Sequence, residues 1–161
     1  MVFVNVHHEI SANSKLAIKE EHDIVYREMP EKSDLIALGI SPPIDATWTR
    51  EIVPDDVLLF RYSALTFNSH RIHYDRRYVT QVEGYPGLIV HGPLIATLLL
   101  DLIRREMPEA SLKKFSFKAL KPIFDISPFK VCGRLDSDRK VKLWATTLDG
   151  FLAMDAEVEI N

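Results

Sequence analysis

The feature that most constrains this chain is an almost unbroken apolar run between two prolines. Pro93 suits the first turn of a helix, where a missing N–H costs nothing, and Pro108 cannot continue one. The sequence therefore predicts a helix from about Pro93 to Met107. Leucine and isoleucine leave almost no polar stripe before Asp101, which is typical of a helix surrounded by protein. The charges that begin at Asp101 come too soon for a membrane span.

Composition limits the remaining possibilities. The chain has 161 residues, of which 47% are hydrophobic and 27% charged, and its net charge is −3. These values are typical of one soluble globular domain with a real core, and they indicate neither nucleic acid nor a membrane surface as a partner. The single cysteine, Cys132, excludes an internal disulfide framework and suits a reducing compartment. The N-terminus lacks the pattern of a secretory signal, so we expect a cytoplasmic protein.

The N-terminal residues predict a hairpin followed by a linker. Residues 2–10 alternate between two faces, residues 11–15 are turn formers, and residues 16–28 are typical of a returning strand. His7 and His8 would point to opposite faces of the first strand, so we expect no metal site there or elsewhere. Residues 29–46 contain several prolines and predict an irregular linker.

Two further helices are indicated between the linker and the apolar run. Residues 47–53 can form a strand, after which Asp55 or Asp56 can cap a helix that ends near Thr66. Asp75 can cap a second, shorter helix over residues 76–81. The polar residues between these helices should therefore lie in a loop.

The C-terminal part predicts strands. Four segments of alternating side chains lie between Phe115 and Ile160, and Asp149-Gly150 is a strong hairpin signal before the last of them. We expect these strands to form a meander, an antiparallel sheet that wraps around the apolar helix in an α+β domain.

Two polar motifs indicate chemistry. The loop from Thr66 to Asp75 contains Asn68 and two histidines, and Gly92 opens the apolar helix directly after His91. The first N–H groups of a helix have no intrahelical partner and can hold a developing oxyanion. A histidine that transfers protons, combined with such donors, is the minimum needed for chemistry next to a carbonyl.

At these motifs the sequence resembles the MaoC-like (hydratase 2) dehydratases, a family with the hot-dog fold. The resemblance covers residues 47–160. In detail, the sequence is similar to the branch that contains mesaconyl-CoA hydratase and the mitochondrial 3-hydroxyacyl-thioester dehydratases. The family motif pairs an aspartate, an asparagine-proline and a histidine-x-aspartate with a later histidine-glycine helix start. The positions in register are Ile72, His73, Asp75, Val90, His91 and Gly92. Three positions depart, because Asn68, His70 and Arg71 replace the family's aspartate, asparagine and proline.

The resemblance implies reversible syn hydration of an α,β-unsaturated acyl-CoA, without a cofactor. His73 would be the sole general base and acid, because Asn68 cannot accept a proton and could only orient the water. The Gly92 N–H would stabilise the thioester oxyanion. His91, Arg71 and Gly87 are the expected substrate-binding residues. Asp75 could be either a catalytic partner or a helix cap, and we favour the cap.

The resemblance also concerns the N-terminus and leaves other functions open. Relatives in the same branch look like double hot-dog chains, and residues 1–28 resemble the last hairpin of a missing first half. We expect this hairpin to pair with the chain's own sheet or with a second subunit, in a homodimer. A non-catalytic acyl-binding subunit and a hot-dog thioesterase are the alternatives, although Asp101 lies too far along the helix from Gly92 to serve a thioesterase.

Overall fold

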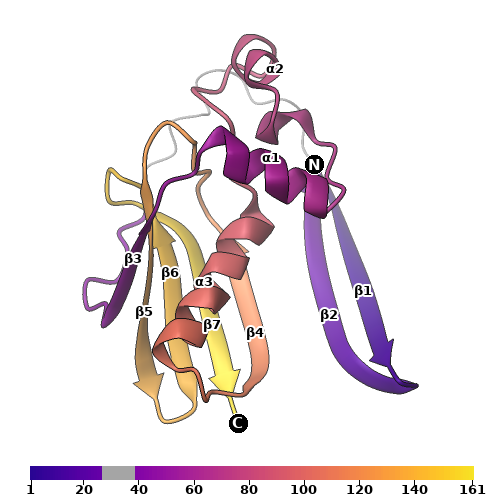
Figure 1. Cartoon of the computed structure of the whole chain (residues 1–161), viewed down its shortest axis with the longest axis vertical. Coiled ribbons are helices and arrows are strands. Elements are labelled where there is room, and N and C mark those ends of the chain that lie inside the picture. The colour runs from indigo at the N-terminus through magenta and orange to yellow at the C-terminus, as the bar shows by residue number, and fades with distance from the viewer. Residues whose placement is uncertain (27–38) are drawn as a thin grey trace. The chain divides into compact units, whose positions relative to one another are not determined.

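The computed structural model describes residues 1–26 and 39–161, which fall into two compact units (Figure 1). The first unit is an antiparallel hairpin of β1 (Val2–Ala12) and β2 (Lys15–Tyr26). Asn13 and Ser14 join the strands with positive φ angles of 51° and 60°, the geometry of a tight two-residue turn. The predicted hairpin is thus confirmed as far as Tyr26, and residues 27 and 28 lie outside the described residues.

The hairpin has one mainly apolar face. Because side chains alternate along a strand and the register pairs Val4 with Ile24 and Ile10 with Ile18, these four side chains share one face. The other face carries mostly polar residues, such as the cross-strand neighbours Asn5 and Asp23. Large apolar side chains of both strands are exposed, so this face has no cover within the hairpin itself.

The second unit contains a five-stranded antiparallel sheet with the strand order β3-β5-β6-β7-β4. Of the predicted linker, residues 29–38 lie outside the described residues, and residues 39–46 contain neither helix nor strand. The strands follow the predicted alternation. Their bounds are Trp48–Ile52 for β3, Leu112–Ala119 for β4, Phe129–Ser137 for β5, Lys140–Thr146 for β6 and Leu152–Ile160 for β7.

The predicted four-strand meander is wrong in one respect. Strands β5, β6 and β7 do form a meander, and Gly150 with a φ of 82° closes the predicted hairpin between the last two. Strand β4 does not pair with β5. It pairs with β7 instead and is the edge strand of the sheet on that side. The physical reason lies in the connection from β4 to β5, which is no tight turn. Its residues Ile123–Asp125 bond to residues 88–90 instead.

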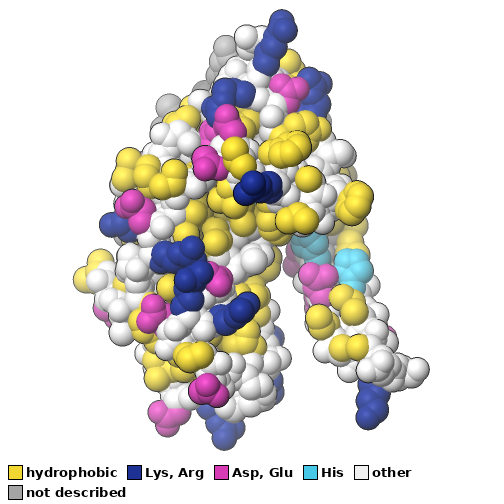
Figure 2. All heavy atoms as spheres, viewed as in Figure 1, with side chains coloured by type: hydrophobic (Ala, Val, Ile, Leu, Met, Phe, Trp, Pro, Cys, Tyr) yellow, Lys and Arg dark blue, Asp and Glu magenta, His cyan; other side chains and the backbone are white. Residues whose placement is uncertain are grey.

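In the part of the chain that the structure describes, three α-helices accompany the sheet, and two of them begin at the predicted aspartates. Helix α1 (Asp56–Leu65) is capped by Asp55, whose carboxylate accepts the Leu58 N–H at 2.7 Å. Helix α2 (Arg76–Gln81) is capped by Asp75, which accepts the Tyr78 N–H at 2.9 Å. Figure 2 shows hydrophobic side chains at the surface over α1, where Val57, Phe60 and Leu65 are exposed.

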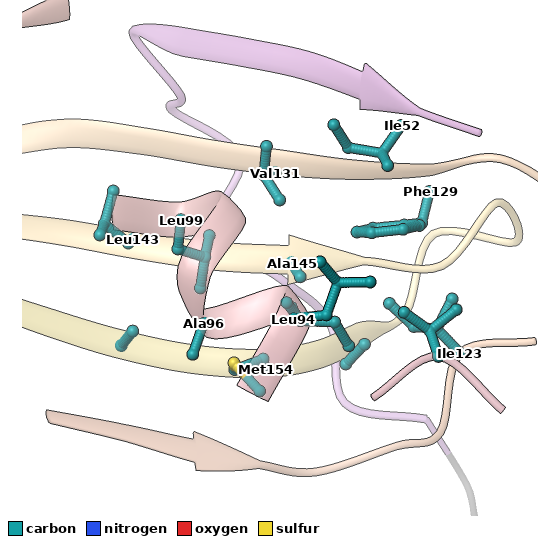
Figure 3. Close-up of a cluster of buried hydrophobic side chains, with 14 of the residues drawn as sticks. Ile52, Leu94, Ala96, Leu99, Ile123, Phe129, Val131, Leu143, Ala145 and Met154 are labelled. Atoms are coloured by element: carbon teal, nitrogen blue, oxygen red, sulfur yellow. The ribbon is translucent and has the colours of Figure 1, made fainter. Parts of the chain in front are cut away.

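Helix α3 (Gly92–Glu106) packs one face against the sheet (Figure 1). Figure 3 shows Leu94, Ala96 and Leu99 among side chains of the sheet. The sheet residues labelled there are Ile52, Phe129, Val131, Leu143, Ala145 and Met154. The expectation that this helix is surrounded by protein is wrong for its outer face. Pro93, Thr97 and Arg104 are exposed there, and Leu98 and Leu100 are only half-buried.

None of the described helices has the length and apolar character needed to cross a membrane.

The packing of α3 predicts a clear difference between two leucines. Leu99 is 0% exposed, whereas Leu65 at the end of α1 is 80% exposed. We expect Leu99→Ala to lower the free energy of unfolding by about 3 kcal/mol, because it leaves a cavity between helix and sheet. Leu65→Ala should change it by less than about 0.5 kcal/mol. Urea denaturation of both variants measures the difference, and equal losses would contradict this account of the core.

Candidate active site

The polar loop begins where α1 ends in a defined capping motif. The Asn68 N–H donates to the Ser63 carbonyl at 2.9 Å and the Phe67 N–H donates to Ala64 at 3.4 Å. Phe67 has a φ of 53°, in the left-handed region that usually selects glycine at this position. This geometry reverses the chain and sends it into the 3-10 turn Arg71–His73.

Asn68 shapes this loop through its side chain. Its Oδ1 accepts the His70 N–H at 3.0 Å, which closes a local turn just before the 3-10 turn. Among the described residues its amide makes no hydrogen bond to His73. Its expected role in orienting water therefore stays a prediction.

His73 is buried, with 8% of its surface exposed, and one hydrogen bond determines its tautomer. Nδ1 lies 2.7 Å from the carbonyl oxygen of Ile89. Because a carbonyl can only accept, Nδ1 carries the proton, and in the neutral ring Nε2 holds a free lone pair. Burial lowers the pKa of His73 below 6.5, the Ile89 bond partly offsets this, and the nearby His70 lowers the pKa further. His73 is therefore largely neutral at pH 7.

His91 lies directly against His73. The two rings stack at a centroid distance of 3.8 Å and an angle of 17°. His91 is fully buried, with its Nε2 2.8 Å from Ser63 Oγ and the Tyr62 ring edge-on at 4.8 Å. Burial and the neighbouring His73 lower the pKa of His91 to about 4. His91 Nδ1 has no hydrogen-bond partner among the described residues.

Gly92 follows His91 at the first position of α3. Its N–H has no backbone partner among the described residues, and Pro93 has no N–H to compete with it. A methyl group added at Gly92 would meet no heavy atom of the described residues within 4 Å, so the space beside it is open. The stacking of His73 on His91 brings the two predicted motifs together at this helix start.

The other predicted substrate-binding residues are engaged within the protein. Arg71 Nη2 binds Asp75 Oδ2 at 2.8 Å, and the guanidinium lies 4.1 Å from the centre of the Tyr78 ring. Gly87 is buried, and a methyl group added there would lie 2.5 Å from Asp125 Oδ1. The substrate-binding roles of Arg71 and Gly87 stay predictions.

A carboxylate suitable for a thioesterase is not found at Asp101. Its Oδ2 accepts hydrogen bonds from Arg50 and Arg105, each at 2.7 Å. The Arg105 bond is the main cause that lowers the pKa of Asp101. This ion-paired carboxylate lies in α3 nine residues after Gly92, away from the start of the helix.

Two contributors to the site were not predicted from the sequence. The Ile89 carbonyl that holds His73 is a backbone group, and no residue type signals its position. Ser63, which contacts His91, carries a weak signal, because it lies four residues after Leu59 on the buried side of α1. A polar residue in an apolar stripe indicates a buried partner.

Comparison with known proteins decides the family. The model of the hydroxyacyl-thioester dehydratase type 2 family matches residues 1–125. The chain belongs to this family. The resemblance to MaoC-like dehydratases, predicted from the two motifs, is thereby confirmed.

Curated relatives extend beyond this chain. The mesaconyl-C(4)-CoA hydratase of Chloroflexus aurantiacus is 46% identical over all 161 residues, which cover 57% of that protein. A mitochondrial family member, the hydroxyacyl-thioester dehydratase type 2 of Schizosaccharomyces pombe, is 32% identical over 84% of this chain and 45% of its own length. The chain thus spans about half the length of the curated relatives it matches.

Solved structures show the fold. HtdX of Mycobacterium tuberculosis matches 98% of this chain and 61% of its own, with a TM-score of 0.74 and 19% identity. An (R)-hydratase of A. caviae involved in PHA biosynthesis matches 73% of this chain and 96% of its own, with a TM-score of 0.62 and 18% identity. The predicted α+β hot-dog fold is confirmed, with the hairpin as an N-terminal addition.

The buried His91 predicts a loss of stability at acid pH. Its pKa is about 4 in the folded protein and near 6.5 when exposed, so the unfolded state binds more protons between these values. Stability should therefore fall as the pH decreases from 6.5 towards 4, by about 3 kcal/mol for this residue.

Urea denaturation at several pH values within that range measures the slope. His91→Gln removes the titrating group and should give a shallower dependence of the free energy of unfolding on pH. The same slope in both proteins would contradict the assignment.

Proposed function

We propose that this chain is an enoyl-CoA hydratase, equally a 3-hydroxyacyl-thioester dehydratase, that adds water reversibly to a short α,β-unsaturated acyl-CoA. The observation that carries the proposal is the bond from His73 Nδ1–H to the Ile89 carbonyl. It leaves Nε2 of a largely neutral imidazole as a base, beside a helix start with a free N–H. The family relationship and the hydratase among the relatives support it.

In this proposal, His73 Nε2 takes a proton from water as the water oxygen adds to the β-carbon. The electron pair of the double bond shifts to the thioester, where the Gly92 N–H and the dipole of α3 stabilise the oxyanion. The protonated His73 then returns a proton to the α-carbon on the same face. The net result is syn addition of water, and the reverse sequence is dehydration.

His73 acts alone as acid and base in this scheme, and Asn68 orients the water. His91 keeps the ring of His73 in place and remains neutral near pH 7, because its own pKa is about 4. Arg71 and Gly87 remain the proposed substrate-binding positions. The relative named mesaconyl-C(4)-CoA hydratase makes mesaconyl-CoA the first substrate to test.

A homodimer in the cytoplasm is part of the same proposal. The mainly apolar face of the β1–β2 hairpin supports pairing with the chain's own sheet or with a second subunit, as expected for residues 1–28. The second candidate function is a non-catalytic acyl-binding subunit. It is favoured by one observation, that the Asn68 amide bonds the His70 backbone and offers no carboxylate for proton transfer.

Substitution of His73 tests the proposal directly. We expect His73→Gln to lower the rate of hydration of crotonyl-CoA and mesaconyl-CoA at least about a hundredfold, because His73 is the general base and acid of the proposed scheme. His70→Ala, in the same loop but exposed, should keep most of the activity. Loss of enoyl absorbance measures hydration, and free thiol would reveal a thioesterase. A folded His73→Gln variant with normal turnover would refute the role, and an inactive wild-type protein would favour the binding subunit.

The pH profile of hydration gives a second test. Because the pKa of His73 is lowered, kcat/KM should fall only below pH 6.5, where the base becomes protonated. Asn68→Asp places a negative charge in the same loop, which favours the imidazolium and should move this acid limb to higher pH. Rates measured across the acid range decide, and an acid limb above pH 6.5 in the wild-type protein would exclude His73 as the base.

A further inference from the structure

A buried carboxylate outside the reaction lies close to the candidate active site. The side chain of Asp125, in the connection between β4 and β5, is 2% exposed. Its Oδ1 accepts the Leu88 N–H at 2.8 Å, and its Oδ2 accepts a hydrogen bond from Arg76. A carboxylate is costly to bury, and here both of its oxygens are engaged.

The neighbouring glycine is matched to this carboxylate. A methyl group at Gly87 would lie 2.5 Å from Asp125 Oδ1 and 2.7 Å from Ile126, closer than real contacts allow. Only glycine therefore lets Asp125 reach the backbone of Leu88. Gly87 thus makes room for this hydrogen bond, whatever its part in substrate binding.

These contacts close a ring that contains His73. Asp125 holds Leu88, and the next residue, Ile89, accepts the hydrogen bond from His73. Three residues after His73, Arg76 is the first residue of α2, and its side chain forms an ion pair with Asp125. The ring thus consists of two short stretches of chain, two hydrogen bonds and one ion pair.

We propose that Asp125 and Arg76 are positioning residues. By closing this ring of contacts, they fix the plane of the His73 imidazole and its tautomer. The inference rests on the proposed function, in which His73 is the general base. Asp125 fixes the direction of the Ile89 carbonyl through Leu88, and Arg76 ties the segment that carries His73 to the same carboxylate. Catalysis is sensitive to such geometry, since small displacements of a reacting group cost up to about a hundredfold in rate.

Arg76 also provides a matched control. It forms a second ion pair with Asp56, whose side chain is 66% exposed. Asp56 and Asp125 therefore both neutralise Arg76, but only Asp125 reaches the Leu88 backbone. Loss of Asp56 leaves the ring closed, and loss of Asp125 opens it.

The test combines ¹⁵N NMR of histidine-labelled protein with hydration kinetics. The His73 signals are assigned by their absence in His73→Gln. In the wild-type protein we expect neutral His73 as the Nδ1–H tautomer. Asp125→Ala should give a mixture of tautomers and lower kcat by about tenfold or more, with a much smaller change in KM. Asp125→Asn keeps an acceptor for Leu88 and should lose less, and Asp56→Asn should match the wild type.

Arg76→Gln opens the ring at a half-exposed position, so the test stands even where Asp125→Ala does not fold. It should shift the tautomer in the same direction. An unchanged His73 tautomer with kcat within about twofold of wild type in the folded Asp125 and Arg76 variants would overturn the proposal. Equal effects of Asp56→Asn and Asp125→Asn would also overturn it. An inactive wild-type protein would instead refute the proposed function, while the NMR measurement still tests the ring.

Discussion

The candidate active site depends on one short stretch of backbone that is hydrogen-bonded on both of its edges. On one edge the Ile89 N–H donates to Ile72 at 3.0 Å, and on the other the Val90 N–H donates to Ile123 at 2.8 Å. The next residue, His91, is the cap of α3, and the packing of α3 on the sheet fixes its position. The His73 imidazole, the His91 ring stacked on it and the Gly92 N–H are thus placed by regular backbone bonds. Polar loop residues alone would hold them less firmly.

Much of the fold could be predicted from local chemistry. Asp55 and Asp75 cap the two short helices because an aspartate before a helical segment satisfies a free N–H, and alternation located the strands. Pairing could not be predicted in the same way. Alternation shows that β4 is a strand, but not that its partner is β7. The connection after β4 has no hairpin signal, and its partner, residues 88–90, is too short to show a period.

The candidate site was predictable to the extent that it depends on residue types in sequence motifs. His73, His91 and Gly92 belong to motifs that a chain of this family carries, and the structure brings them together. The groups that fix their states are a carbonyl and a hydroxyl, at Ile89 and Ser63, and only coordinates identify these. Stacked imidazoles at 3.8 Å cannot readily both be charged, and burial keeps His91 neutral by lowering its pKa to about 4. Different environments thus give two identical side chains different pKa shifts.

The connection between β4 and β5 has a consequence for how the molecule loses its shape. The same nine-residue stretch, residues 120–128, continues an edge strand of the sheet and bonds to the backbone segment whose Ile89 carbonyl holds His73. Fraying that starts at this margin of the sheet would loosen residues 88–90, which include the carbonyl that holds His73. The site and the sheet margin therefore belong to one cooperative unit, and a local opening at this margin would release His73 before the whole domain melts.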